Sequence, residues 1–273
     1  MGVDPETGFP VPFDFTNLEF IEAYFKYLHH PEEKRGVDFW WMDWQQGNVS
    51  AVEGLDPLWM LNHYHHYDLR RNGKRGVMLS RYSGLGSHRY PMGFSGDVHV
   101  TWNALQYQPY FTATAANVGY TWWSHDIGGH MGGEKDNELY VRFLQFGVFS
   151  PINRLHSSKS NNFSKMPAAY MNGAGEIAKK FLRLRHAMLP FLYSAACETA
   201  EQGLALIEPM YYEYPQEKEA YECPGEYLFG RQLIVAPVTE KGDEHGMALT
   251  KVWLPEGRYT DSFTGDVYAG GGQ

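Results

Sequence analysis

The sequence has 273 residues, 16% of them aromatic, and a formal net charge of −9 at pH 7. This acidic balance argues against a nucleic-acid partner, which requires a concentrated basic surface, and no apolar run approaches the roughly 20 residues of a membrane span. Because the N-terminus also lacks the apolar core of a signal peptide, we expect a soluble, cytoplasmic chain with no membrane partner, folded as one large domain or as a large and a small one.

Helix and strand signals alternate from the start of the chain. A helix is predicted from a cap at Thr16 or Asn17 to the sequence His29-His30-Pro31, because apolar residues recur there at three- and four-residue steps. The apolar run 37–42 predicts a strand, and the helix after it closes at Asn72-Gly73. A short strand over 77–80, a loop over 81–90 rich in glycine and serine, and an apolar stretch over 91–94 follow.

The alternation continues through the middle of the chain. Helices are predicted over about 104–116 and 138–146, strands over 119–123 and 148–152, and one long helix from Glu176 to about Glu201. Strands spaced by helices of this length indicate right-handed βαβ units and a parallel sheet, with polar residues gathered just after each strand. Such a chain has too few strands to close an eight-stranded barrel, so we expect it to start partway round one.

Beyond about residue 204 the pattern changes to short apolar runs separated by turns. The runs 232–236, 251–254 and 258–263 are typical of an all-β region. We therefore expect a catalytic barrel portion over 1–204 and a proximal C-terminal β-sandwich portion over 205–273. The second portion is expected to be truncated, because a few strands with open edges rarely complete a sandwich.

Two aspartates stand among aromatic and glycine residues. Asp43 ends the strand-like run in GVDFWWMDWQQ, and Asp97 lies in FSGDV. Two carboxylates that face one aromatic-walled pocket are the working groups of a glycoside hydrolase. Each aspartate alone also has a structural interpretation, as a cap of a helix or loop. The pair points to sugar chemistry.

Five motifs in order extend this interpretation to nearly the whole chain. They are WWMDWQQG, LSRYSGLGSHRYPMGFSGD, WSHDIGGH, FSPINRLHS and YLFGRQLIVAPV. With them the chain resembles the middle of a family 31 glycoside hydrolase, the family of α-glucosidases and α-xylosidases. The resemblance implies the α/β class, as a partial (β/α)8 TIM-type barrel of about strands 4–8 followed by a small all-β region.

The resemblance also implies a retaining mechanism. Asp43 would be the nucleophile that forms a glycosyl ester, and Asp97 the acid that protonates the departing oxygen and later activates water. Retention requires the two carboxyl groups about 5–5.5 Å apart, against about 6.5–9.5 Å for inversion, with Asp97 protonated while Asp43 is ionised. Trp44-Gln45-Gln46 stands where many members have Met-Asn-Glu. This departure makes it unsafe to transfer substrate preference from those members.

Further residues match family positions around the sugar. Arg81, Asp126 and His156 correspond to groups that bind the sugar at subsite −1, although each can also be read as a structural ion pair or a satisfied buried polar residue. Trp41 and Trp123 are candidates for the pocket wall, with core packing as the competing interpretation for single aromatics.

We expect no cofactor and no metal. Of three histidines on the second predicted helix only His63 and His66 share a face, and no glutamate is placed as in a zinc protease motif. His125 and His130 bracket a glycine turn and are equally unconvincing as ligands. Arg154 either orients acidic residues or forms an ordinary salt bridge.

The leading interpretation is a retaining α-glycosidase, as an α-glucosidase that hydrolyses the non-reducing terminal α-glucosyl residue of an α-linked oligosaccharide. One alternative is an inactive truncated fragment or a sugar-binding remnant, because the resemblance begins inside the barrel. Another is an α-xylosidase or α-galactosidase, which keeps the two carboxylates and changes only the pocket.

Overall fold

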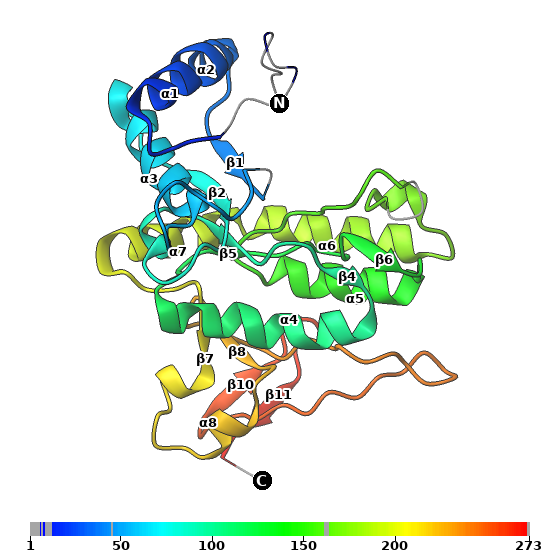
Figure 1. The fold of residues 1–273 in the computed structure, drawn as a ribbon. Helices are drawn as coiled ribbons and strands as arrows, with labels where there is room; N and C mark the ends of the chain where they lie inside the picture. Colours follow the sequence, from blue (N-terminus) through cyan, green and yellow to red (C-terminus); the bar gives the residue numbers. More distant parts are fainter. Residues whose placement is uncertain (1–5, 7, 9–12, 45, 161–163, 272–273) are drawn as a thin grey trace. The chain divides into compact units, whose positions relative to one another are not determined.

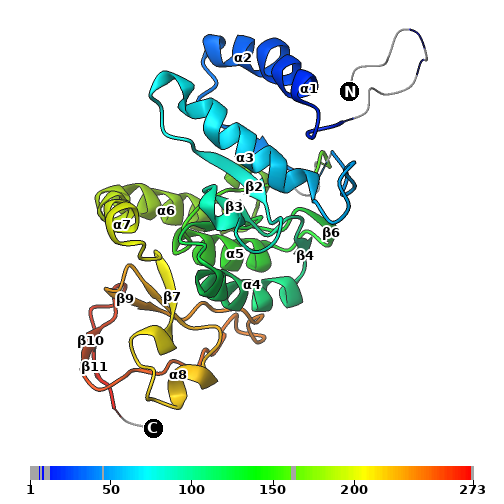
Figure 2. The ribbon, with the colours of Figure 1, turned by 60° about the vertical axis from the view of Figure 1, so that its left-hand side comes forward.

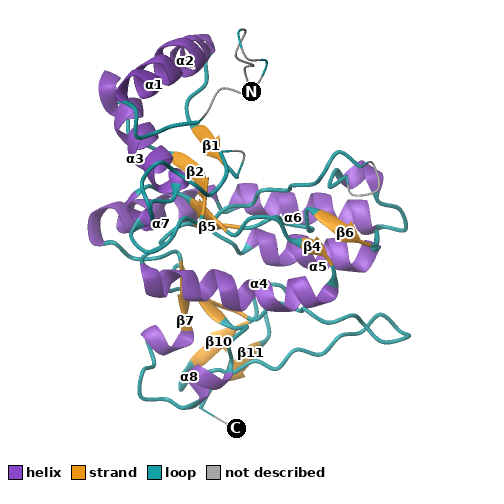
Figure 3. Cartoon of the chain, viewed as in Figure 1, coloured by secondary structure: helices purple, strands orange, loops and turns teal. Residues whose placement is uncertain are grey.

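The computed structural model describes residues 6, 8, 13–44, 46–160 and 164–271. The chain forms two compact units, Met1–Gly96 and Asp97–Gln273. Figure 1 labels their helices and strands, and Figure 3 distinguishes the two kinds of element by colour. Among the described residues no helix is both long and apolar enough to cross a membrane.

The first helical segment begins where the sequence predicts and ends later. The side chain of Asn17 accepts hydrogen bonds from two backbone N–H groups of the first turn. Pro31 does not end the segment, because a π-helical turn precedes it and Pro31 then lies in the first turn of the next helix, where its missing N–H is tolerated. The chain leaves the segment at Gly36. Its parts are α1 (Leu18–Ala23), η1 (Tyr24–His29) and α2 (His30–Arg35).

The sheet of the first unit is parallel. Met42 pairs with Ser80 across the first two strands, and Arg81 pairs with Phe94 across the next two. The predicted strand 37–42 is confirmed only over its last three residues, so Asp43 comes directly after it. The elements are β1 (Trp40–Met42), α3 (Pro57–Leu69), η2 (Arg70–Asn72), β2 (Met78–Arg81), η3 (Ser87–Arg89) and β3 (Gly93–Phe94).

In the second unit, two predicted helices are confirmed to within two residues at each end: α4 (Trp102–Thr114) and α5 (Asn137–Val148). Thr101 and Asp136 cap them by accepting hydrogen bonds from first-turn N–H groups. This unit also contains a short parallel strand pair, in which His99 pairs with Met131 and Val100 pairs with Gly133. The remaining elements of this part are β4 (His99–Val100), η4 (Ala115–Val118), β5 (Trp123–Ser124) and β6 (Met131–Gly133).

Two expectations for this region are wrong. The run 148–152 is not a strand, because α5 continues to Val148 and buries its last apolar residues as part of a helix. The parallel pairing in this region is instead a bridge between Ile127 and Leu155. A short apolar run fits a buried helix as well as a strand. The predicted helix 176–201 is two helices, α6 (Ala174–Ala187) and α7 (Leu189–Gln202), because Pro190 lacks the N–H that would continue the ladder. The views in Figures 1 and 2 agree that α5 and α6 run side by side.

The C-terminal part is antiparallel, as predicted, although its strands are shorter. One sheet has the order β7-β8-β9 and a second sheet pairs β10 with β11. The runs 232–236 and 258–263 each contain a strand, whereas 251–254 contains none in this fully described stretch. The elements here are β7 (Ile207–Pro209), η7 (Met210–Tyr212), α8 (Glu219–Glu222), β8 (Tyr227–Phe229), β9 (Leu233–Val235), β10 (Arg258–Thr260) and β11 (Val267–Ala269), whereas η6 (Pro167–Ala169) precedes α6.

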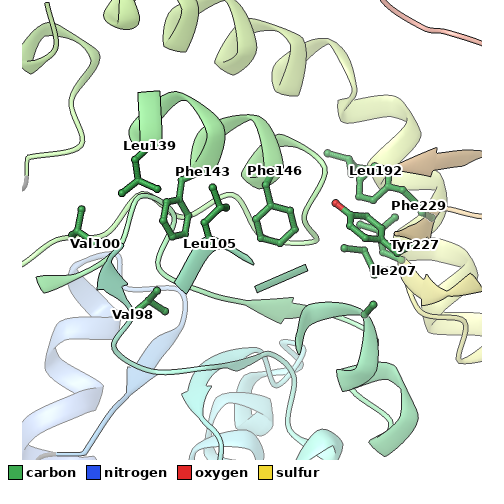
Figure 4. Packing of buried hydrophobic residues seen from close by; sticks show 13 residues of the cluster. Val98, Val100, Leu105, Leu139, Phe143, Phe146, Leu192, Ile207, Tyr227 and Phe229 are labelled. Atoms are coloured by element: carbon green, nitrogen blue, oxygen red, sulfur yellow. The ribbon is translucent and has the colours of Figure 1, made fainter. Parts of the chain in front are cut away.

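The largest buried apolar cluster lies in the second unit (Figure 4). Helix α5 contributes Leu139, Phe143 and Phe146, which are three to four residues apart and therefore share one helix face. Strands β7 and β8 contribute Ile207 and Tyr227 to the same cluster, which joins the helical part of this unit to its antiparallel part.

We expect Phe143→Ala to lower the free energy of unfolding by about 3–5 kcal/mol, because it removes a fully buried ring and leaves a cavity. Tyr193→Ala on α7 is the matched control, since this ring is 73% exposed and should cost less than about 0.5 kcal/mol. Urea unfolding measures both values. Equal losses in the two variants would contradict the packing described here.

Candidate active site

The first candidate site is the ion pair between Asp43 and Arg81. Because β1 and β2 run parallel with Met42 opposite Ser80, the next residue on each strand is brought level with the other. Arg81 Nε donates a hydrogen bond of 2.6 Å to Asp43 Oδ1. Both side chains are largely shielded from solvent, at 24% exposed for Arg81 and 13% for Asp43. Two of the three sequence candidates from this unit, Asp43 and Arg81, are therefore in direct contact.

Aromatic rings and a glycine hold the Arg81 side chain in place. Its guanidinium carbon lies 5.4 Å from the centre of the Phe94 ring, within cation–π range. Trp41 meets the same ring edge to face, with 5.8 Å between ring centres. Gly96 has a φ of +87°, and a Cβ there would lie 2.0 Å from Arg81 Nη1. Only glycine leaves room for the guanidinium at this position.

A cavity of about 210 Å³ borders Asp43 within the first unit. Its other walls are mostly aromatic and histidine side chains, and Trp41, which is 44% exposed, belongs to them. Exposed aromatic rings beside a carboxylate are suited to stack on the apolar face of a sugar. Trp41 is thus available for the predicted sugar contact. The remaining lining residues are Phe13, Tyr24, His29, Trp40, Met42, Gln46, Leu61 and His65.

The second candidate site surrounds Asp126 in the other unit. Asp126 is fully buried, and Arg154 donates a hydrogen bond to its Oδ1. Burial raises the pKa of Asp126, whereas the cation of Arg154 opposes that change. Both interpretations offered for Arg154 hold at once, because its salt bridge also orients an acidic candidate. Oδ2 of Asp126 is buried and has no hydrogen-bond partner among the described residues.

His130 lies between Asp97 and Asp126, and His156 stacks on it. The imidazole of His130 lies 4.0 Å from Asp97 Oδ1 and 4.0 Å from Asp126 Oδ2, each measured from a different ring nitrogen. The ring of His156 stacks on that of His130, with 4.6 Å between ring centres. The structure therefore groups three sequence candidates of the second unit around a histidine that the sequence reasoning set aside. His130 is the last residue of the motif WSHDIGGH, but nothing in the sequence indicates a role for it beyond its place after a glycine turn.

Trp123 is buried rather than exposed. It is 2% exposed, and its ring packs against Phe111 and Tyr120. The neighbouring His125 is completely buried and stacks on Phe146, and burial lowers its pKa to about 3. These contacts favour the packing interpretation for Trp123, and its role at the pocket wall stays a prediction.

The sequence analysis also missed Lys165. Its side chain is 5% exposed, and its stem crosses the glycine turn so closely that a Cβ on Gly128 would lie 2.7 Å from Lys165 Cδ. Burial lowers the pKa of Lys165 to about 8, and the charge of Asp126 opposes that shift. A lysine followed by methionine and proline carries no recognisable signal, so only the fold reveals it.

Asp126, His130 and His156 are also the group in the described chain that could hold a metal ion. Zinc bonds to nitrogen and oxygen are about 2.0–2.2 Å long, and tetrahedral ligand atoms then lie roughly 3.3–3.5 Å apart. The separation of 4.0 Å between Asp126 Oδ2 and His130 Nδ1 would instead require a nearly linear arrangement. As placed, the group does not fit zinc.

Sequence comparison identifies both parts of the chain. Residues 3–195 match the glycosyl hydrolases family 31 TIM-barrel domain, and residues 203–273 match the glycosyl hydrolase family 31 C-terminal domain. The chain is 30% identical over 200 residues to alpha-glucosidase 2 of Bacillus thermoamyloliquefaciens, covering 73% of this chain and 25% of that protein. It is 28% identical over 261 residues to an alpha-xylosidase of Saccharolobus solfataricus, covering 92% of this chain and 35% of that protein.

Solved structures agree with the sequence matches. A family 31 dextranase of Flavobacterium johnsoniae, complexed with glucose, superimposes with a TM-score of 0.81 at 28% identity, covering 98% of this chain and 37% of that one. A family 31 alpha-xylosidase from a soil metagenome, complexed with xylose, gives 0.81 at 25% identity, covering 95% and 44%. The chain thus spans less than half the length of these relatives. The barrel portion and C-terminal region expected from the sequence are confirmed as the fold class.

We expect Gly96→Ala to displace the Arg81 guanidinium, because the added Cβ would occupy its place. Gly84→Ala is the matched control: Gly84 also has a positive φ, +105°, but nothing lies within 4 Å of its Cβ position. Both variants carry the backbone cost of about 1–2 kcal/mol, and only the first should break the Asp43–Arg81 hydrogen bond. Crystal structures of the two variants decide this, and an unchanged bond in Gly96→Ala would refute the steric argument.

The buried His125 predicts a stability that falls as the pH falls. Its folded-state pKa, about 3, lies below the value of 6.5 for an exposed histidine, so between these values the unfolded chain binds a proton that the native state does not. We expect His125→Gln to reduce the loss of unfolding free energy between pH 7 and pH 5 by about 2 kcal/mol. His245→Gln, at a side chain 77% exposed, should leave that loss unchanged. Urea unfolding at the two pH values tests this, and equal pH dependence in both variants would contradict it.

Proposed function

The chain belongs to glycoside hydrolase family 31, and we propose that it hydrolyses α-glycosidic bonds with retention of configuration, using Asp43 as nucleophile and Asp97 as acid and base. The observation that carries this proposal is the Asp43–Arg81 pair at the carboxyl end of parallel strands. A nucleophilic carboxylate must be held in one orientation, and Arg81 fixes Oδ1 while Phe94 and Gly96 fix Arg81.

The proposed reaction has two displacements. In the first, Asp97 gives its proton to the glycosidic oxygen as the bond from that oxygen to the anomeric carbon breaks, and Asp43 Oδ2 forms an ester bond to the same carbon. In the second, Asp97 takes a proton from water, the water oxygen bonds to the anomeric carbon, and the Asp43 ester breaks. Each displacement inverts the carbon, so the product keeps the α configuration.

We assign sugar binding to charged and aromatic residues of each unit, those beside Asp43 in the first and those grouped with Asp97 in the second. Arg81 and His156 can donate hydrogen bonds to sugar hydroxyls, and the carboxylate of Asp126, oriented by Arg154, can accept them. Trp41 is proposed to stack on the sugar, which its exposure supports. Trp123 is proposed to back the pocket from within the core, because its ring is buried.

We propose α-glucosides as the substrates, with α-xylosides as the second candidate. The α-glucosidase relative with 30% identity supports the first, and the α-xylosidase relative that matches 92% of the chain supports the second. We also keep the domain boundary near residue 204, as a barrel portion over 1–204 and a C-terminal portion over 205–273. The family matches on either side, 3–195 and 203–273, support this division.

We expect Asp43→Asn to lower kcat for p-nitrophenyl α-glucoside by roughly 10⁴-fold or more, because an amide cannot replace the attacking carboxylate. The isosteric control is Asp38→Asn, five positions earlier at a side chain 84% exposed, which should retain the parent rate. The same assay with p-nitrophenyl α-xyloside ranks the two substrates by kcat/KM.

Three results would overturn parts of the proposal. If the parent chain hydrolyses neither of the two glycosides, the alternative of a sugar-binding remnant is favoured. A full rate in Asp43→Asn would remove Asp43 as nucleophile. If proton NMR shows that the sugar is first released as the β-anomer, retention is excluded.

A further inference from the structure

We propose that His130 is a positioning residue for Asp97: its imidazole, held between the carboxylates of Asp97 and Asp126, stabilises the charge that Asp97 acquires when it donates its proton. This inference rests on the proposed acid role of Asp97. His130 closes the motif WSHDIGGH but is not among the residues expected to bind the sugar, and its proposed role follows from where the fold places the ring.

Backbone contacts fix His130 beside Asp97. The N–H of His130 donates a hydrogen bond of 2.5 Å to the carbonyl of Val98, the residue after Asp97. The carbonyl of His130 accepts a hydrogen bond of 2.9 Å from the N–H of Ser158. Gly129 permits this approach, since a Cβ there would lie 2.8 Å from the carbonyl oxygen of His99. Three separate segments of the second unit therefore meet at this one residue.

The neighbouring side chains show which way the ring faces. His130 Nε2 lies 4.0 Å from Asp97 Oδ1, and His130 Nδ1 lies 4.0 Å from Asp126 Oδ2. The stacked ring of His156 covers one face of the imidazole. Arg154 holds the other oxygen of Asp126, so the carboxylate that faces Nδ1 is itself oriented. In this arrangement the Nε2 edge of His130 faces Asp97.

Limited exposure to solvent strengthens the interaction between the Nε2 edge of His130 and Asp97. The side chain of His130 is 19% exposed and that of Asp97 34% exposed, so solvent screens their interaction only in part. Asp97 is neutral before the first displacement and negative after it. A donor or cation that is already oriented toward that oxygen is worth more in the transition state than in the ground state, which is the condition for faster chemistry.

The proton balance of the reaction is unchanged by His130. The Asp97 proton moves to the glycosidic oxygen, the leaving group departs as an alcohol, and Asp97 later regains a proton from water. His130 neither gives nor accepts a proton in these steps. Its effect must therefore scale with how much the leaving group depends on protonation, which is large for a sugar alcohol and small for an acidic phenol.

The test compares two substrates in His130→Phe, which keeps a flat ring for His156 to stack on and removes both nitrogens. We expect kcat/KM to fall about 10-fold to 100-fold for maltose and less than about 3-fold for 2,4-dinitrophenyl α-glucoside. His130→Gln, which restores one N–H donor, should recover part of the maltose activity. A loss of the same size on both substrates, or no loss on either, would overturn the proposal.

Control variants separate this inference from the proposed function. Asp97→Ala should show the same substrate dependence more strongly, and if it does not, the acid role itself is wrong. If Asp97→Ala shows the dependence and His130→Phe and His130→Gln do not, only the role of His130 is wrong. His245→Phe, at an exposed histidine of the same unit, should match the parent on both substrates. Circular dichroism checks the fold of each variant. If His130→Phe does not fold, His130→Gln takes its place: a partial loss confined to maltose supports the proposal, and no loss on maltose or an equal loss on both substrates overturns it.

Discussion

The parallel register of β1 and β2 is the constraint on which the Asp43–Arg81 pair of the first unit depends. It sets Asp43 level with Arg81, and their hydrogen bond of 2.6 Å then orients the carboxylate. The remaining features serve this contact: Phe94 lies beneath the guanidinium and Gly96 leaves room beside it. A slip of one residue in this register would turn Asp43 to the other side of the sheet and separate the pair.

A buried charge organises the second unit in a comparable way. Asp126 has no access to solvent, and burying an isolated carboxylate is costly unless a partner compensates. Arg154 supplies that partner, and His130 and Lys165 add further positive or polar groups around it. The groups that make the buried aspartate tolerable also hold the neighbouring side chains in place. Stability and orientation are therefore supplied by the same contacts here.

Many of the helix positions could be predicted from the sequence. The cap at Asn17 and the apolar spacing of the first helical segment and of α5 predicted helix positions, because capping and periodicity are local properties. Pro190 was the missed local signal, since it divides the predicted helix 176–201. The run 148–152 was mistaken because a short apolar segment satisfies helix and strand equally, and only packing selects between them.

Sequence alone established the family, the barrel-plus-β class and the Asp43 and Asp97 candidates, because ordered motifs and periodicity are carried by residue identity and spacing. The three-dimensional fold was needed to show that Trp41 is exposed while Trp123 is packed in the core. It was also needed to place His130 between two carboxylates and Lys165 across a glycine turn. These are contacts between residues far apart in the chain or across a turn. Their distances depend on how whole elements pack, and local sequence does not encode that packing.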